Sequence, residues 1–126
     1  MCKSNWKINE VPEDCVGFVY KITNKQTKKF YIGKKSFYSR TSKKVKGRTN
    51  KKWTVKESNW RSYCSSSKEL QEDIKSLGIE NFEFEILELC KSKRQMSYFE
   101  TNYQFLFKVL ETNSYNKNIL GKFFRL

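Results

Sequence analysis

Histidine is absent from all 126 residues of the sequence. This absence excludes Ser-His-Asp and Cys-His catalysis and every nuclease design that uses a histidine base. A general base in this chain must therefore be a tyrosine, a lysine, a carboxylate or water itself. Cysteine is scarce and scattered, with four residues and no Cys-x-x-Cys spacing. Such a pattern favours small buried cysteines over a zinc site or a disulfide framework.

Long hydrophobic runs are also missing. No stretch approaches the roughly 18 apolar residues that cross a bilayer, and the N-terminal "MCKSNWKINE" lacks the apolar segment of a signal peptide. We therefore expect a cytoplasmic protein with no membrane partner. The length of 126 residues, with ten Phe, seven Tyr and three Trp, predicts one folded domain over residues 1–126.

Acidic residues are almost absent from one part of the chain. From Lys21 to Arg61 there are fifteen basic residues and a single acid, Glu57, whereas residues 62–126 contain nine of each sign. The excess positive charge of +13 therefore lies almost entirely in the first part. A localised basic region indicates a surface that binds a polyanion, and we favour nucleic acid. A solvated surface usually mixes both signs, and a membrane-binding segment would show an amphipathic helical repeat.

The hydrophobic pattern predicts an α+β fold with a small three-stranded antiparallel sheet flanked by helices. Residues 16–23 and 30–34 are rich in β-branched and aromatic residues, flank a polar turn and predict a hairpin. Residues 81–89 alternate as a third strand. Between the hairpin and the first helix, residues 36–57 show little periodicity, and we expect a long basic loop there, with one short helix as the alternative.

Two helices are expected from their capping signals. Ser66 and Glu69 have the spacing of a capping box before an apolar repeat, and Gly78 provides the stop. A second helix is expected from Ser92 to about Leu110. The element order is thus strand, strand, loop, helix, strand, helix.

Each strand of the hairpin contains a tyrosine. If the turn comprises residues 25–28, Tyr20 lies opposite Gly33, and Tyr31 lies diagonally on the same face. The two phenols would then share one side of the sheet beside the open space at Gly33. Tyrosine is also common in strands for packing alone, so the spacing by itself leaves a catalytic and a structural role open.

These two segments resemble the signature of the GIY-YIG nuclease family. In "GFVY", Phe18, Val19 and Tyr20 stand where the family has Gly, Ile and Tyr, and "YIG", Tyr31 to Gly33, matches in full. The resemblance extends over residues 16–120 and is greatest to short phage-type members, some of them homing endonucleases. It implies a DNA endonuclease, in the host cytoplasm if the chain is phage-encoded.

Two further positions fit the family. Glu100 lies in the second predicted helix, and Asn116 follows Tyr115 near the end of the motif-bearing region. At 100° per residue, Glu100 falls near the inward stripe of its helix, where an acid is costly unless it meets a cation or a metal. The alternative is a boundary carboxylate that pairs with a lysine.

The resemblance implies a role for each of these residues. Glu100 would bind one divalent cation, Mg²⁺ or Mn²⁺, Tyr20 would accept the proton of the attacking water, and Tyr31 would hydrogen-bond the base or the phosphate. Asn116 would hold the site together. Arg40, nine residues after Tyr31, would neutralise charge in the transition state, with three rivals: Lys35, Arg48 and Arg61.

The expected partner is DNA. The residues expected to contact its backbone are Lys34, Lys43, Lys44, Lys46, Arg48, Lys51, Lys52 and Arg61. Sequence specificity would come from the basic loop, from a homodimer or from an accessory recognition protein. The alternatives are a non-catalytic DNA- or RNA-binding domain that keeps the fold, and a ribosome-associated structural protein.

Overall fold

The main sheet of the protein is three-stranded and antiparallel. The computed structural model describes residues 4–44, 47 and 51–126, with the backbone alone for 40–44 and 51–54. The strands β1 (Gly17–Asn24), β2 (Phe30–Ser36) and β5 (Phe82–Cys90) are arranged in the order β2-β1-β5. The expected α+β architecture is confirmed.

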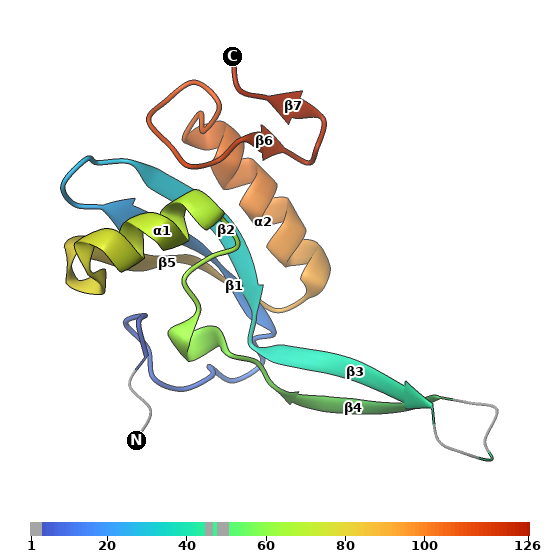
Figure 1. Cartoon of the computed structure of the whole chain (residues 1–126). Coiled ribbons are helices and arrows are strands. Elements are labelled where there is room, and N and C mark those ends of the chain that lie inside the picture. Colours follow the sequence, from blue (N-terminus) through green and yellow to red (C-terminus); the bar gives the residue numbers. More distant parts are fainter. Residues whose placement is uncertain (1–3, 45–46, 48–50) are drawn as a thin grey trace.

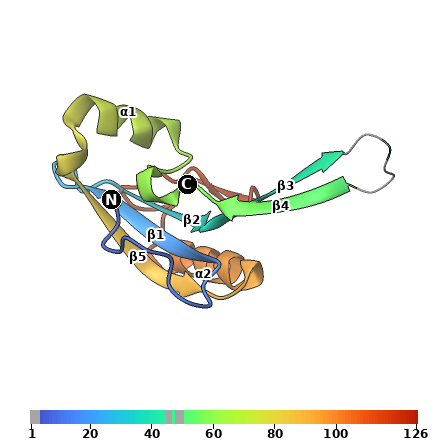
Figure 2. The ribbon, with the colours of Figure 1, turned by 90° about the horizontal axis from the view of Figure 1, so that it is seen from below.

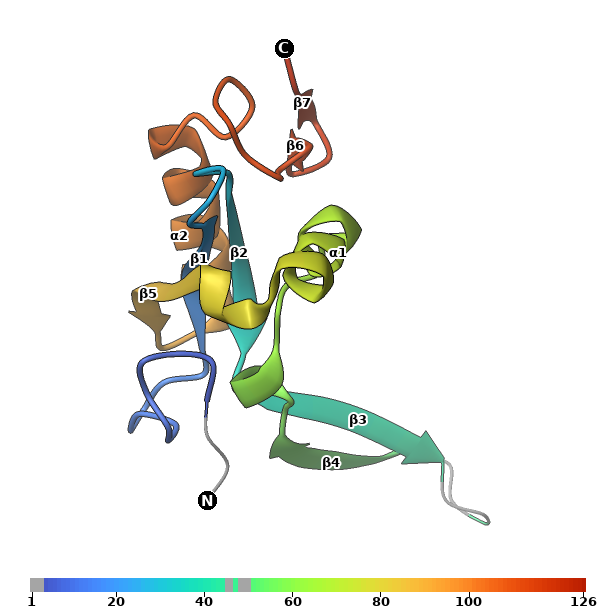
Figure 3. The same ribbon diagram turned by 60° about the vertical axis from the view of Figure 1, so that its left-hand side comes forward.

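Two helices lie on opposite faces of this sheet (Figures 2 and 3). Helix α1 (Lys68–Leu77) covers one face together with the 3-10 turns η1 (Trp60–Ser62) and η2 (Ile79–Asn81). Helix α2 (Lys93–Leu106) covers the other face. Because side chains alternate along a strand, Tyr20 packs in the core on the α1 side, whereas its neighbour Val19 packs on the α2 side.

The helix ends follow local capping chemistry, with two corrections. The N-cap of α1 is Ser67, which accepts a hydrogen bond from the backbone N–H of Leu70, and not the predicted Ser66. Ser92 caps α2 as predicted. Helix α2 ends at Leu106 and not near Leu110, because the chain turns into the left-handed region at Lys108, where φ is 51°.

The segment after the first hairpin is not the predicted basic loop. Strands β3 (Tyr38–Lys44) and β4 (Lys51–Glu57) form a second antiparallel hairpin that projects from the body (Figure 1). Tyr38 and Thr41 in β3, and the run Trp53 to Val55 in β4, favour extended backbone. Interspersed lysines obscure the alternation of apolar and polar residues, so periodicity alone misses these strands.

The register of the first hairpin agrees with the prediction. Tyr20 is paired with Gly33, and Tyr31 with Ile22. On the other side of β1, the pairing with β5 shifts between Val19 and Tyr20. A bulge of this kind increases local twist and redirects a side chain, and it lies next to Tyr20.

The outer edge of β2 is closed by the C-terminal part of the chain. The backbone N–H of Tyr115 donates to the carbonyl oxygen of Phe30 at 2.7 Å. Farther along, β6 (Asn118–Ile119) and β7 (Phe123–Phe124) form a short two-stranded ribbon. The edge strand is therefore covered, which protects it from pairing with another chain. No helix in the described part of the chain is long and apolar enough to cross a membrane.

Candidate active site

Tyr20 lies at the centre of the candidate site, and its phenol occupies the space over Gly33. A Cβ atom at Gly33 would be 2.5 Å from the Tyr20 hydroxyl oxygen and 2.7 Å from its Cζ. The Tyr20 side chain is almost fully buried, and burial raises its pKa well above the usual value. The neighbouring groups Tyr63, Tyr31 and Glu100 raise this pKa further. Tyr20 is therefore a neutral phenol at pH 7 in the protein alone.

Tyr31 lies beside Tyr20 on the same face of the sheet. The two ring centroids are 6.1 Å apart, and the hydroxyl of Tyr31 shares a hydrogen bond of 3.2 Å with that of Ser66. Burial raises the pKa of Tyr31, while the hydrogen bond to Ser66 opposes that shift. The half-buried ring of Tyr31 also borders a pocket of about 400 Å³ between the start of α1 and the segment 115–118. This phenol, unlike that of Tyr20, adjoins open space.

Glu100 comes from α2, on the opposite side of the sheet from the two phenols. After burial, its negative charge is one of the causes that raise the pKa of both tyrosines. Burial raises the pKa of Glu100 itself, and the charge of Lys34 acts in the opposite direction. The ammonium of Lys34 donates a hydrogen bond to the Ser97 hydroxyl at 2.9 Å. The predicted DNA contact Lys34 thus lies close to the predicted metal ligand.

The chemistry of the Glu100 carboxylate suits a divalent cation. Among the described residues, no hydrogen bond or ion pair holds this half-buried group. Those residues also contain no cluster of three or more metal-binding side chains. Mg²⁺ commonly binds one or two carboxylates, with water and phosphate oxygens completing its shell. Glu100 fits such an ion, and DNA and water would supply the other ligands.

A third tyrosine, Tyr63, was not predicted from the sequence. Its ring packs edge-on against that of Tyr20, with centroids 6.0 Å apart. The ammonium of Lys35 lies over the Tyr63 ring, 4.4 Å from its centroid, and burial lowers the pKa of Lys35. Lys35 thus contacts Tyr63, and the Tyr63 ring in turn packs against the buried phenol of Tyr20. A tyrosine between a 3-10 turn and a helix carries no local signal that would have identified it.

Asn116 binds the strand that carries Tyr31 and Gly33. Its side-chain oxygen accepts a hydrogen bond of 3.0 Å from the backbone N–H of Ile32, and its amide donates one of 2.9 Å to the carbonyl oxygen of Ile32. Asn116 thereby pairs with the edge of β2 as a neighbouring strand would. Ile32 lies between Tyr31 and Gly33 in β2. The two hydrogen bonds therefore hold the part of the strand that carries both residues, as the predicted role of Asn116 requires.

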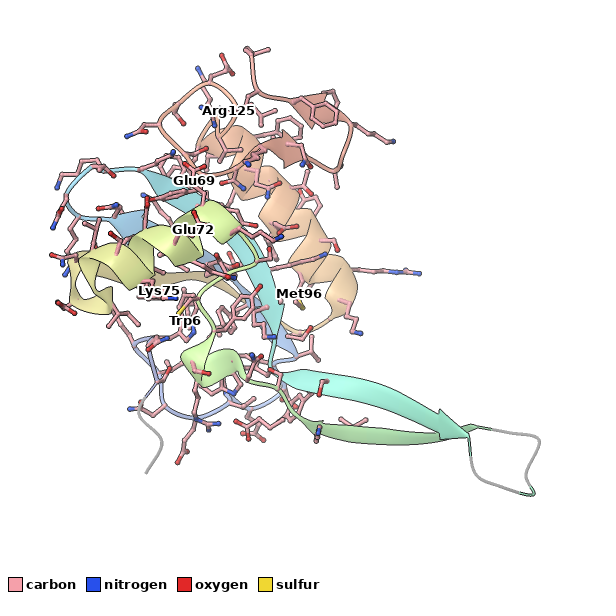
Figure 4. All side chains as sticks on the ribbon, in the orientation of Figure 1. Trp6, Glu69, Glu72, Lys75, Met96 and Arg125 are labelled. Carbon is pink, nitrogen blue, oxygen red and sulfur yellow. The ribbon has the colours of Figure 1, made fainter. Side chains whose placement is uncertain are left out.

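Arg125 in turn holds the turn that presents Asn116. Its guanidinium donates to the carbonyl oxygens of Val109 at 2.7 Å and of Asn116 at 2.9 Å, and to the Ser114 hydroxyl at 3.0 Å. Figure 4 shows Arg125 at the same end of the molecule as the C-terminal end of α2. The sequence gives no sign of these contacts, because most of the acceptors are backbone carbonyls.

The other predicted cations lie apart from the tyrosines or outside the described side chains. Arg61 forms an ion pair with Glu57 and donates to the carbonyl oxygen of Asn9 at 3.0 Å, at the base of the second hairpin. Arg40 belongs to β3, where its backbone is paired with Val55. Lys46 and Arg48 lie outside the described residues, and of four lysines the backbone alone is described: Lys43, Lys44, Lys51 and Lys52.

Comparison with protein families gives a match that covers most of the chain. Residues 1–119 match the family model described as "Putative endonuclease segE, GIY-YIG domain". The chain belongs to the GIY-YIG family. Comparison with curated proteins gave no match, and comparison with solved structures gave none. The GIY-YIG match covers both tyrosines, Glu100 and Asn116, and it ends before Arg125. Membership of this family makes the chain an endonuclease domain, with DNA as its substrate.

Proposed function

We propose that the chain is a metal-dependent endonuclease that hydrolyses phosphodiester bonds in DNA, with residues 1–126 acting as one domain. The observation that supports this most directly is the Glu100 carboxylate. It is half-buried, has no hydrogen-bond or ion-pair partner within the described part of the chain, and its charge is one of the causes that raise the pKa of Tyr20 and Tyr31. A structural carboxylate in such a position would be expected to have a partner.

The residues of the chain would divide the reaction between them. Hydrolysis joins a water oxygen to phosphorus and breaks the bond to the 3′ oxygen. Mg²⁺ or Mn²⁺ on Glu100 would neutralise charge on the phosphate. Tyr31, whose hydroxyl adjoins the pocket, would orient the phosphate, and Tyr20 would accept the proton of the water. Because the pKa of Tyr20 is raised, its phenol needs positive charge nearby to act as a base, and our candidate is Lys35, whose ammonium lies over the neighbouring Tyr63 ring.

The described residues hold one such site, so one copy would cut one strand at a time. Cleavage of both strands would need a second copy or a second cut by the same copy, and an accessory protein would serve recognition of the target. A phage origin and a role in homing are part of this proposal and rest on the resemblance of the sequence to short phage-type members of the family. A non-catalytic nucleic-acid-binding domain is the alternative that the experiment below separates.

Glu100→Gln tests the proposal, with Glu111→Gln as a matched control. Both substitutions remove one negative charge, but Glu111 is exposed beyond the end of α2. We expect Glu100→Gln to reduce nicking of supercoiled plasmid in Mg²⁺ to the level seen with EDTA. Its affinity for DNA should stay the same or rise slightly, because the substitution removes a negative charge near the phosphate. Glu111→Gln should cleave like the unmodified chain.

Cleavage, filter binding and thermal unfolding are measured on the same preparations. Plasmid binding without any cleavage by the unmodified chain would favour the non-catalytic alternative. Full cleavage by Glu100→Gln would rule out Glu100 as the metal ligand. Equal losses of cleavage in the two variants would mean that the change in net charge is responsible and not the Glu100 carboxylate.

A further inference from the structure

The second hairpin follows directly on the strand that carries the site. We call β3 and β4, residues 38–44 and 51–57, the basic arm. A single residue, Phe37, separates the end of β2 at Ser36 from the start of β3. Figures 1 and 3 show the arm projecting from the end of β2 away from the helices. Gly33 and the base of the arm are thus joined by one nearly continuous extended segment.

The base of the arm is fixed to the core through both of its strands. Phe37 is fully buried, and its ring lies 5.1 Å from that of Phe18 and 5.0 Å from that of Trp60. The backbone N–H of Ser58 donates to the carbonyl oxygen of Phe37 at 2.8 Å, and the Ser58 hydroxyl donates to that of Ser36 at 2.6 Å.

The end of β4 is held as well. Glu57 accepts a hydrogen bond of 2.8 Å from the indole N–H of Trp60 and pairs with Arg61. Buried aromatic contacts and short hydrogen bonds thus anchor both strands of the arm to the core at its base.

The outer part of the arm places like charges opposite one another. Lys43 is paired with Lys52, and Lys44 with Lys51. Like charges directly opposite one another on neighbouring strands destabilise a hairpin. A bound polyanion would neutralise these lysines and so stabilise the arm. The major groove of a DNA duplex admits a two-stranded ribbon of this kind. Duplex DNA fits the arm better than an acidic protein, because phosphates follow its length at regular intervals.

The length of the arm sets how far along the duplex it reaches. The first and last Cα atoms of the seven-residue strand β3 are six steps of about 3.3 Å apart, so β3 spans about 20 Å from its start at Tyr38. One base pair occupies about 3.4 Å, so this distance corresponds to about six base pairs. We propose that the basic arm binds the duplex on one side of the scissile phosphate only, and that its length fixes how much DNA the enzyme needs on that side. This inference rests on the proposed function.

Cleavage near duplex ends tests the reach of the arm. The substrates are end-labelled, random-sequence duplexes of about 12 to 30 base pairs, a range chosen to bracket the six-base-pair reach. The measured quantity is the shortest distance from a cut to each end of the cleaved strand. We expect unequal distances, with the longer one always on the same side in terms of strand polarity.

An arm-shortened variant keeps all the lysines. Deleting Thr41 and Ser42 together with their partners, Thr54 and Trp53, removes two cross-strand pairs and preserves the face on which each remaining residue lies. The longer distance should then fall by about two base pairs, while the shorter one stays unchanged. Equal distances in the unmodified chain, or a longer distance that does not change on shortening, would overturn the inference.

A second variant, Lys43→Ala with Lys52→Ala, covers the case in which the shortened arm does not fold. It keeps the length of the arm, and in fluorescence anisotropy with a random duplex its salt slope should fall by about 0.9 for each DNA phosphate that the arm no longer neutralises. An unchanged slope would show that the arm does not touch DNA. If the unmodified chain cleaves DNA but the cleavage distances and the arm variants do not give the expected results, only the inference about the arm is wrong. If it neither binds nor cleaves duplex DNA, the proposed function fails as well.

Discussion

A methyl group at Gly33 would force apart the two tyrosines of the site. The added Cβ would lie 2.5 Å from the Tyr20 hydroxyl oxygen, 2.7 Å from its Cζ and 2.9 Å from Cε2 of Tyr31. Non-bonded atoms are most stable at about 3.5 Å or more, so the Tyr20 phenol would have to move by about 1 Å. The rings of Trp6 and Tyr63 pack against Tyr20, with centroids 5.1 and 6.0 Å away, and leave it no free direction.

The expected cost follows from this displacement. Overpacking of a core usually destabilises a protein by about 1–3 kcal/mol, and Gly33→Ala should fall in that range. A misplacement of about 1 Å at a reacting group can reduce the rate about 10²-fold. Gly33→Ala should therefore lose roughly two orders of magnitude in cleavage while most of the chain remains folded at 25 °C.

Urea denaturation and plasmid cleavage measure the two effects, and a double-mutant cycle with Tyr20→Leu identifies their source. Leucine lacks the atoms that collide with the new Cβ, so Gly33→Ala should cost much less in that background, with a coupling of about 0.5–3 kcal/mol. Additive free energies of unfolding would mean that Tyr20 does not occupy the space over Gly33. Near-normal cleavage by Gly33→Ala would mean that the position of this phenol does not matter for the reaction.

Two more predictions concern the neighbours of Tyr20. Tyr63→Phe removes the hydroxyl beside the Tyr20 phenol but keeps the ring under Lys35. Cleavage should fall about two- to tenfold, which is the equivalent of one hydrogen bond. The exposed control Tyr98→Phe should cleave at the normal rate. The pKa of Glu100 is raised in the folded protein. Above that pKa the ionised carboxylate therefore destabilises the fold, and this destabilisation disappears as the pH falls through the raised pKa. In EDTA, Glu100→Gln should therefore melt at a higher temperature than the unmodified chain at pH 7 and at the same temperature near pH 4; equal melting at both values would contradict the burial of this charge.

The first hairpin could be predicted in detail because its signals are local. A polar turn between two β-branched and aromatic runs fixes the register, and the register alone places Tyr20 opposite Gly33. The second hairpin escaped prediction because its strands are dense in lysine. Charged residues are poor indicators of burial, and this hairpin is stabilised at its base by core aromatics such as Phe37 and Trp60, far from its tip.

The site was predictable only in part, and for a related reason. The family resemblance identified Tyr20, Tyr31, Glu100 and Asn116, but it gave none of the contacts between them. The placement of Lys35 over Tyr63 and the two hydrogen bonds between Asn116 and Ile32 join segments that are distant in the sequence. Such contacts depend on how the layers pack, and a single sequence does not encode them in any local pattern.

The candidate site is assembled from both layers that cover the sheet. The two phenols face the α1 side, and Glu100 belongs to α2 on the other side. Elements of a fold open independently, with free energies below that of global unfolding. Detachment of α2 alone would therefore separate the carboxylate from the phenols while the sheet and its other cover remained intact. Heat inactivation of such an enzyme would be a local and reversible event that precedes denaturation, and catalytic activity would report on the docking of one helix.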